Sequence, residues 1–150
     1  MPGVTTTRET LLGCLSVPRW ADDVLAGQPY ADRQALLLAA NSAARELTDE
    51  ELDQALASHP RIGERGGARS QSEQSGVDPA AGDTAQRLAA GNAAYEQRFG
   101  RVFLIRAAGR DADEILGELD RRLHNDDRAE RAEVVDNLRE IALLRLDASL

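Results

Sequence analysis

The sequence predicts an all-α protein, a single compact domain of about seven or eight mostly antiparallel helices. Its 150 residues fit one domain with one core. Apolar residues make up 42% of the chain and aromatic residues only 3%, so the core is expected to be mainly aliphatic. Helix-start signals recur along the chain, whereas no alternating apolar and polar run of useful length predicts a strand. We expect one domain over residues 1–150, with disorder allowed in residues 1–7.

Helices are expected throughout the segment before residue 60, each opened by a recognisable signal. Two signals are capping boxes, in which a threonine and a glutamate three residues later each bond the other's main-chain N–H. The others are a proline suited to the first helical turn and an aspartate that can cap a helix. The signals are Thr6-Thr7-Arg8-Glu9, Pro18, Asp32 and Thr48-Asp49-Glu50-Glu51, and the helices end near Leu15, Leu25, Glu46 and Ser58.

The second half is expected to contain a loop, a short helix, one ambiguous segment and three longer helices. Residues 60–69 carry several glycines and form the loop, and Ser70 and Glu73 have the spacing of another capping box. The segment RVFLIRAAG at 101–109 fits a short extended piece or a buried loop. The longer helices follow Gly82-Asp83, Asp111 and Asp126, and end near Phe99 (closed by Gly100), His124 and Asp147.

Composition and charge argue against several classes of function. The net charge of −8 disfavours a nucleic-acid-binding protein, which normally has a basic face. No apolar run approaches the ~20 residues of a membrane-spanning helix, and the N-terminus lacks the pattern of a signal peptide. The lone Cys14 excludes an internal disulfide and a multi-cysteine metal site. A cytoplasmic protein without nucleic-acid or membrane partners is the simplest interpretation.

The residue types also limit the chemistry. All 18 basic residues are arginine, so no lysine can form a Schiff base with a carbonyl substrate or with pyridoxal phosphate. The two histidines, His59 and His124, have no close ligand spacing, and no HExxH motif occurs, so no metal site is predicted. The GxSxG elbow and the GK[ST] ending of a phosphate loop are also missing, although a Ser-His-acid triad stays open.

Three polar side chains fall on apolar helical stripes. At about 100° per residue, His59 follows the apolar face of the helix before it, Asn92 lies on that of the long middle helix, and Arg145 on that of the last helix. Buried polar groups need partners, and a buried guanidinium needs an anion or several acceptors. Each residue also has an ordinary structural interpretation, as a satisfied core histidine, a structural asparagine, or an arginine that pairs with an internal acid or reaches solvent. His124 lies off the apolar face of its helix and is expected to be exposed.

Several segments, taken in order, resemble the 2-oxo-4-hydroxy-4-carboxy-5-ureidoimidazoline (OHCU) decarboxylases of urate breakdown. They are SHPRIGE at 58–64, SQSEQSGV at 70–77, NAAYEQRFGRVFLI at 92–105, GR at 109–110, RLHND at 122–126 and LREIALLRL at 138–146. The combination covers nearly all of the chain and is far more specific than any one segment. The resemblance implies an all-helical, homodimeric enzyme that needs no cofactor. It would convert the unstable product of hydroxyisourate hydrolysis to (S)-allantoin and CO₂, which suggests a functional pairing with a hydroxyisourate hydrolase, either fused to this chain or separate from it.

The resemblance also assigns site residues by matching motif positions. His59 takes the place of the catalytic histidine, Glu73 lies in a Ser-x-x-Glu-Gln motif that contacts substrate or assists catalysis, and the FLI segment lines the pocket and offers main-chain hydrogen bonds. The implied catalytic residues are His59 and Glu73, and the implied substrate-binding residues are Pro60, Ser70, Gln74, Phe103, Ile105 and Arg145. The chain departs from the family pattern at Arg101-Val102, Arg106 and Ala108, which affects the expected pocket rim more than the reaction.

This reaction suits a chain without lysine. Decarboxylation leaves an electron pair on carbon, and most enzymes supply a sink for it through a cofactor, a metal or an imine. Here the substrate's own C=N and carbonyl groups can accept the electrons. Our hypothesis is that Arg145 binds a substrate oxygen, His59 moves a proton and Glu73 holds His59 or the ureido N–H groups. The ordinary pKa of an imidazole, near ~6.5, suits this role at neutral pH.

Other functions remain open from the residues alone. A non-catalytic helical module for a small anionic ligand would use Arg145 and the arginines of 61–69 but would not need His59. A ureide hydrolase or tautomerase would turn over the substrate without releasing CO₂. If the protein were an all-α interaction domain, the positions of the three polar residues on apolar stripes would be a coincidence.

Overall fold

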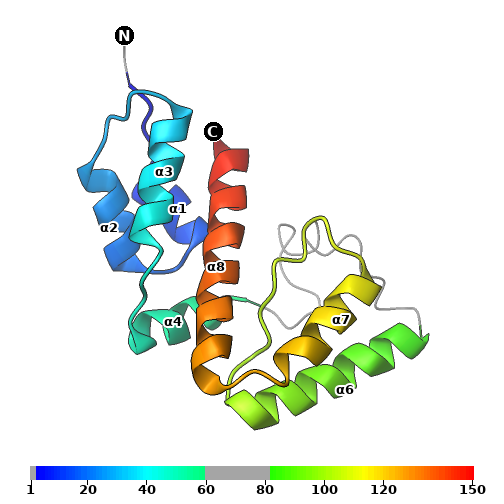
Figure 1. Ribbon diagram of the computed structural model, residues 1–150. Helices are drawn as coiled ribbons and strands as arrows, with labels where there is room; N and C mark the ends of the chain where they lie inside the picture. The colour runs from blue at the N-terminus through cyan, green and yellow to red at the C-terminus, as the bar shows by residue number, and fades with distance from the viewer. Residues whose placement is uncertain (1–2, 60–81) are drawn as a thin grey trace. The chain divides into compact units, whose positions relative to one another are not determined.

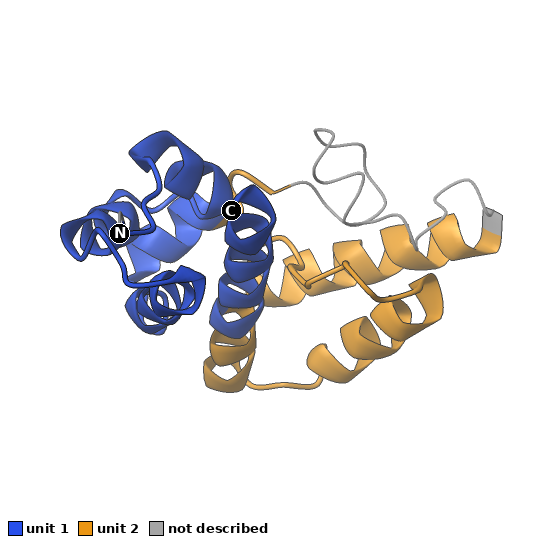
Figure 2. Ribbon diagram, turned by 90° about the horizontal axis from the view of Figure 1, so that it is seen from above, with its two compact units in different colours: residues 1–55, 135–150 blue, residues 56–134 orange. Residues whose placement is uncertain are grey.

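The computed structural model describes residues 3–59 and 82–150, and these ranges contain seven α-helices (Figure 1). Within them there is no strand, only an isolated antiparallel bridge between Val4 and Tyr30, so the predicted all-α fold is confirmed. The chain divides into two compact units, which are described separately (Figure 2). Unit 1 comprises residues 1–55 and 135–150, and unit 2 comprises residues 56–134. No helix in the described ranges is both long enough and apolar enough to cross a membrane.

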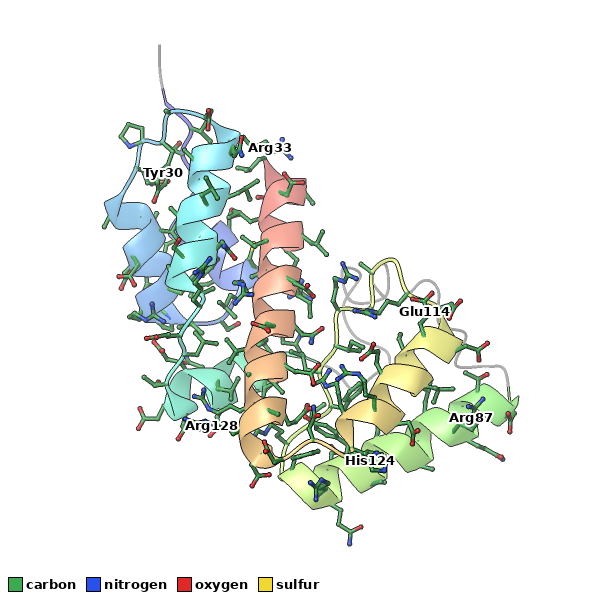
Figure 3. All side chains as sticks on the ribbon, viewed as in Figure 1. Tyr30, Arg33, Arg87, Glu114, His124 and Arg128 are labelled. Atoms are coloured by element: carbon green, nitrogen blue, oxygen red, sulfur yellow. The ribbon has the colours of Figure 1, made fainter. Side chains whose placement is uncertain are left out.

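Unit 1 is built from short helices and the greater part of the last one. The helices are α1 (Arg8–Cys14), α2 (Pro18–Ala26), α3 (Arg33–Ala43), α4 (Asp49–Leu56), whose last residue falls in unit 2, and the part of α8 (Asp127–Ser149) from residue 135. α2 packs against both α1 and α3. Trp20 is fully buried, and its indole Nε1 donates to the main-chain oxygen of Ala40 at 2.9 Å. Arg33, at the start of α3, donates to the Asp147 carboxylate at 2.7 Å and so joins α3 to the end of α8 (Figure 3).

The helix starts of unit 1 follow the predicted signals. Pro18 occupies the first turn of α2, and Asp32 caps α3 by accepting from the Ala35 N–H at 2.8 Å. Thr48 and Glu51 form the predicted capping box, with hydrogen bonds of 2.9 and 3.1 Å. The first cap differs by one residue, because Thr7 rather than Thr6 accepts from the next turn.

The end of α3 was predicted wrongly: the helix stops at Ala43 rather than near Glu46. The reason is a side chain from another helix. Arg19 of α2 donates to the main-chain oxygens of Ala43 and Glu46, at 3.0 and 2.9 Å. The bond to Ala43 satisfies a carbonyl group that the end of the helix leaves free, and the bond to Glu46 holds the segment that follows it.

Unit 2 contains two helices packed together and a buried loop. α6 (Gly82–Phe99) contacts α7 (Ala112–Arg122), and the first turns of α8 complete the unit. The predicted starts of α7 and α8 are confirmed, because Asp111 and Asp126 each accept from a main-chain N–H three residues later. Residues 101–109 form neither helix nor strand, which settles the ambiguous segment as a loop. Gly100, just before the loop, and Gly109, at its end, have positive φ angles of 71° and 80°, a conformation that glycine adopts without strain.

The apolar core of unit 2 is formed by α6, the loop and α7. Its buried members are Leu88, Tyr95, Phe103, Ile105, Ala107, Ile115, Leu116 and Leu119. The loop therefore buries side chains in the core just as the two helices do. This packing holds the loop against α6 and α7.

Candidate active site

The structure describes half of the site residues that the sequence predicts. His59, Phe103 and Ile105 belong to unit 2, and Arg145 belongs to unit 1. Pro60, Ser70, Glu73 and Gln74 lie outside the described residues, as does the predicted short helix from Ser70. The hypothesis that His59, Glu73 and Arg145 act together on one substrate thus stays a prediction.

His59 lies just beyond a helix end, as its sequence position indicates. α4 ends at Leu56, two residues earlier than predicted, and the His59 main-chain N–H donates back to the Leu56 oxygen at 3.1 Å. The His59 side chain is partly buried. A histidine at this point is not confined to the helix surface and can reach a ligand beside the turn.

Phe103 and Ile105 are committed to the core by their side chains. They are only 1% and 4% exposed, and the Phe103 ring packs edge-on against the Tyr95 ring at 5.1 Å between centroids. In contrast, the main chain of neither residue is hydrogen-bonded to another described residue. Buried main-chain N–H and C=O groups are nearly always paired in folded proteins. At Phe103 and Ile105, the groups that can bond a ligand are therefore those of the main chain.

Next to the loop lies a buried ion pair that the sequence analysis missed. Arg122 and Glu130 are 1% and 0% exposed, and their closest atoms, Nη2 and Oε2, are 2.5 Å apart. The Arg122 Nε atom adds longer bonds to the same carboxylate, at 3.0 and 3.1 Å. The remaining guanidinium nitrogen, Nη1, donates to the main-chain oxygen of Leu104 at 2.8 Å. The Tyr95 hydroxyl donates to Glu130 from the other side.

The surroundings of this cluster favour the hydrogen bonds that hold it together. Burial, and secondly the hydrogen bond to Glu130, raise the pKa of the Tyr95 hydroxyl, so the phenol stays a proton donor. The Arg122 guanidinium lies 4.6 Å from the centre of the Phe103 ring, a distance at which the cation is attracted by the ring face. Breaking such a pair by removing one partner would leave a buried, uncompensated charge.

Helical periodicity could have found the ion pair. Arg122 follows Ile115 by seven residues and Leu119 by three, and Glu130 precedes Val134 by four, so both charges lie on buried stripes. The same periodicity that places His59, Asn92 and Arg145 on apolar stripes therefore also places Arg122 and Glu130 there.

The other polar residues on stripes differ in burial, and His124, off its stripe, is exposed as predicted. Asn92 is buried in α6. Arg145 is partly buried in α8, next to the fully buried Leu146. His124 is exposed past the end of α7, and its Nδ1 atom lies 2.9 Å from the main-chain oxygen of Asp120 (Figure 3).

Two surface grooves in the described residues, each of about 690 Å³, contain none of the predicted site residues. One, in unit 1, surrounds Arg19, whose guanidinium is bound by Glu51, Asp23 and two main-chain oxygens. The other, in unit 2, runs along α6 and α7 past Gly91 and Gly117. In the described ranges, no group of three or more His, Cys, Asp or Glu residues is placed to hold a metal ion. Neither groove indicates a reaction.

Solved structures share the fold of this chain, and a family model identifies its family. The solved structure of an OHCU decarboxylase in the presence of (S)-allantoin superposes with a TM-score of 0.81 at 23% identity, over 96% of this chain and 98% of that one. An (S)-allantoin synthase superposes with a TM-score of 0.67 at 16% identity, over 95% of this chain but only 49% of the synthase. No curated protein sequence matches the chain. The model of the OHCU decarboxylase family matches residues 4–147, nearly the whole chain, and the protein therefore belongs to the OHCU decarboxylase family.

Proposed function

We propose that this protein decarboxylates OHCU to (S)-allantoin in urate breakdown, by acid–base catalysis without a cofactor. Membership of the OHCU decarboxylase family carries the proposal. The solved relative obtained with (S)-allantoin supports the choice of product. The motif positions of the sequence supply the residue roles, and the homodimer and the pairing with a hydroxyisourate hydrolase belong to the same proposal.

The reaction balances without an external electron acceptor. The bond between the ring carbon and its carboxylate breaks, and its electron pair moves toward the neighbouring ring C=N as CO₂ leaves. The hydroxyl on the same carbon loses its proton and becomes a carbonyl. Protons are taken up by the ring nitrogen and by the carbon that carries the ureido group. Delivery of the latter proton to one face alone gives a single enantiomer.

The residues divide this work between orientation and proton transfer. Arg145 binds an anionic or carbonyl oxygen of the substrate through its planar set of donors. His59 exchanges the proton, because a neutral imidazole can accept one from the hydroxyl and an imidazolium can return it to carbon. Glu73 holds His59 or the ureido N–H groups, while Ser70 and Gln74 fix one face of the ring. Main-chain groups of Phe103 and Ile105 bond the ring or ureido amides.

The test follows the optical activity of the product. Urate is converted in situ with a urate oxidase and a hydroxyisourate hydrolase, and this protein is then added. We expect faster growth of the circular dichroism signal of (S)-allantoin, with one CO₂ released per allantoin formed. A rate equal to that without the protein would refute the proposal. Loss of substrate without CO₂ would instead indicate a hydrolase or tautomerase, and binding without turnover would indicate the non-catalytic module.

A further inference from the structure

The loop at 101–109 lacks regular structure, yet one of its peptide groups is fixed by a buried arginine. Arg122 reaches across 18 residues of sequence to donate to the Leu104 oxygen, at 2.8 Å. The same guanidinium lies over the Phe103 ring, so it contacts two successive residues of the loop. Its other nitrogens are held by Glu130, which is itself bound by Tyr95. Residues of α6 and α8 thus hold the guanidinium in place independently of its hydrogen bond to the loop.

This single hydrogen bond determines where a neighbouring donor points. The Leu104 oxygen and the Ile105 N–H belong to one planar trans peptide group, in which the C=O and the N–H point in opposite directions. Fixing the oxygen toward Arg122 therefore directs the Ile105 N–H away from the buried ion pair. That N–H is bonded to no other described residue. The apolar contacts of Phe103 and Ile105 locate the loop but, being non-directional, do not set this rotation.

We propose that Arg122 is a positioning residue for the reaction: with Glu130 and Tyr95 it orients the 104–105 peptide group so that the Ile105 N–H is directed at the substrate. The inference rests on the proposed function and extends it to residues outside the predicted site. It also accounts for the presence of the ion pair. Apolar side chains of similar volume often stabilise a protein as well as a buried ion pair does. They cannot, however, orient a peptide group.

The decisive variant replaces the pair by apolar residues. Arg122→Met combined with Glu130→Leu removes both charges together and leaves no buried charge unpaired. We expect it to fold, with wild-type helical circular dichroism and cooperative melting. We expect kcat to fall at least ~10-fold, since small misplacements of binding groups cost this much or more. A folded double variant with wild-type kcat and KM would overturn the proposal.

The neighbouring arginine provides a matched control. Arg121 also pairs with a glutamate of α8, since its Nη2 lies 2.6 Å from Glu133 Oε1, but its side chain is 52% exposed. None of its hydrogen bonds to described residues reaches the loop. Arg121→Met combined with Glu133→Leu should keep wild-type kcat. An equal loss of kcat in this control would attribute the effect to general damage and overturn the positioning role.

A conservative variant and a measurement without substrate keep the test independent of folding and of activity. Arg122→Lys keeps the charge, but one ammonium group cannot reproduce the geometry of a guanidinium that bonds Glu130 and Leu104 together. In the full-length protein we expect the Ile105 amide to exchange with solvent at a changed rate in this variant, while amides of α6 and α7 keep theirs. An unchanged Ile105 rate would refute the orienting role even if the wild type proved inactive. If the wild type proved inactive but the exchange rate of the Ile105 amide changed in Arg122→Lys, the proposed function would be refuted and the orienting role would not.

Discussion

Gly91 of α6 lies directly against Leu119 of α7: a Cβ atom built on Gly91 would stand 2.3 Å from Leu119 Cδ2. Leu119 is buried in the core of unit 2, and its side chain would have to shift to admit the new methyl group. Gly91→Ala should therefore lower the free energy of unfolding by about 1–3 kcal/mol, the usual cost of overpacking. Urea denaturation followed by circular dichroism measures it.

A second glycine in unit 2 provides the control. Gly117 is also helical, but nothing lies within 4 Å of its built Cβ. Gly117→Ala should raise stability by up to ~1 kcal/mol, because alanine is the better helix former. Equal effects of the two substitutions would contradict the close contact between α6 and α7.

Glu51 should make part of the stability of unit 1 depend on pH. The hydrogen bond from Arg19, and to a lesser extent the Thr48 N–H, hold the pKa of the Glu51 carboxyl below its ordinary value. Because the folded pKa is lower than the unfolded one, near ~4.3, the contribution is fully present above that pH and is lost as the pH falls through the folded pKa. Glu51→Gln should thus be less stable than wild type at neutral pH, and the difference should shrink below pH ~4.

Urea unfolding at a series of pH values measures the Glu51 effect. Glu50→Gln serves as the control, since Glu50 is an exposed carboxylate in the same first turn. A stability difference between Glu51→Gln and wild type that stays constant from neutral to acidic pH would show that the ion pair with Arg19 contributes nothing.

His59→Ala should lose at least ~10²-fold in kcat, the lower end of what a positioned acid–base group contributes. The variant should fold normally, because the side chain is only partly buried and lies outside a helix. His124→Ala, which changes the exposed histidine after α7, should turn over like the wild type. The coupled circular dichroism assay measures both variants. Near-normal turnover by His59→Ala would remove this histidine from the mechanism.

Arg145→Gln should reduce kcat/KM by about 10- to 100-fold, as expected for a lost charge-assisted hydrogen bond to substrate. Arg145→Lys should recover only part of this, since an ammonium group lacks the planar set of donors. The matched control is Arg128→Gln, an exposed arginine near the start of the same helix (Figure 3). If Arg145→Gln keeps the wild-type kcat/KM, Arg145 does not bind substrate.

The features predictable from sequence are those set by neighbours in the chain. The caps at Asp32, Thr48 and Asp111, and the glycine that closes α6, depend on side chains within a few residues of the helix end. The early end of α3 depends on Arg19, which lies more than twenty residues away. Periodicity cannot detect such a partner, because it compares positions within one helix.

The candidate site shows the same contrast between features set within one helix and features set by distant partners. Periodicity placed His59 and Arg145 on apolar stripes, and it could have placed Arg122 there too. What it could not supply is the identity of the partners. That Arg122 meets both Glu130 and the Leu104 oxygen depends on how the loop, α7 and α8 pack within unit 2.

Unit 1 joins residues 1–55 to residues 135–150, and the hydrogen bonds between Arg33 and Asp147 connect these two stretches. On the ribosome, the first helices emerge long before the stretch that completes their unit. Residues 56–134 form a contiguous stretch and need not wait for residues 135–150 to be synthesised. The order of biosynthesis therefore favours folding of the central segment first, with the helices of residues 1–55 awaiting residues 135–150.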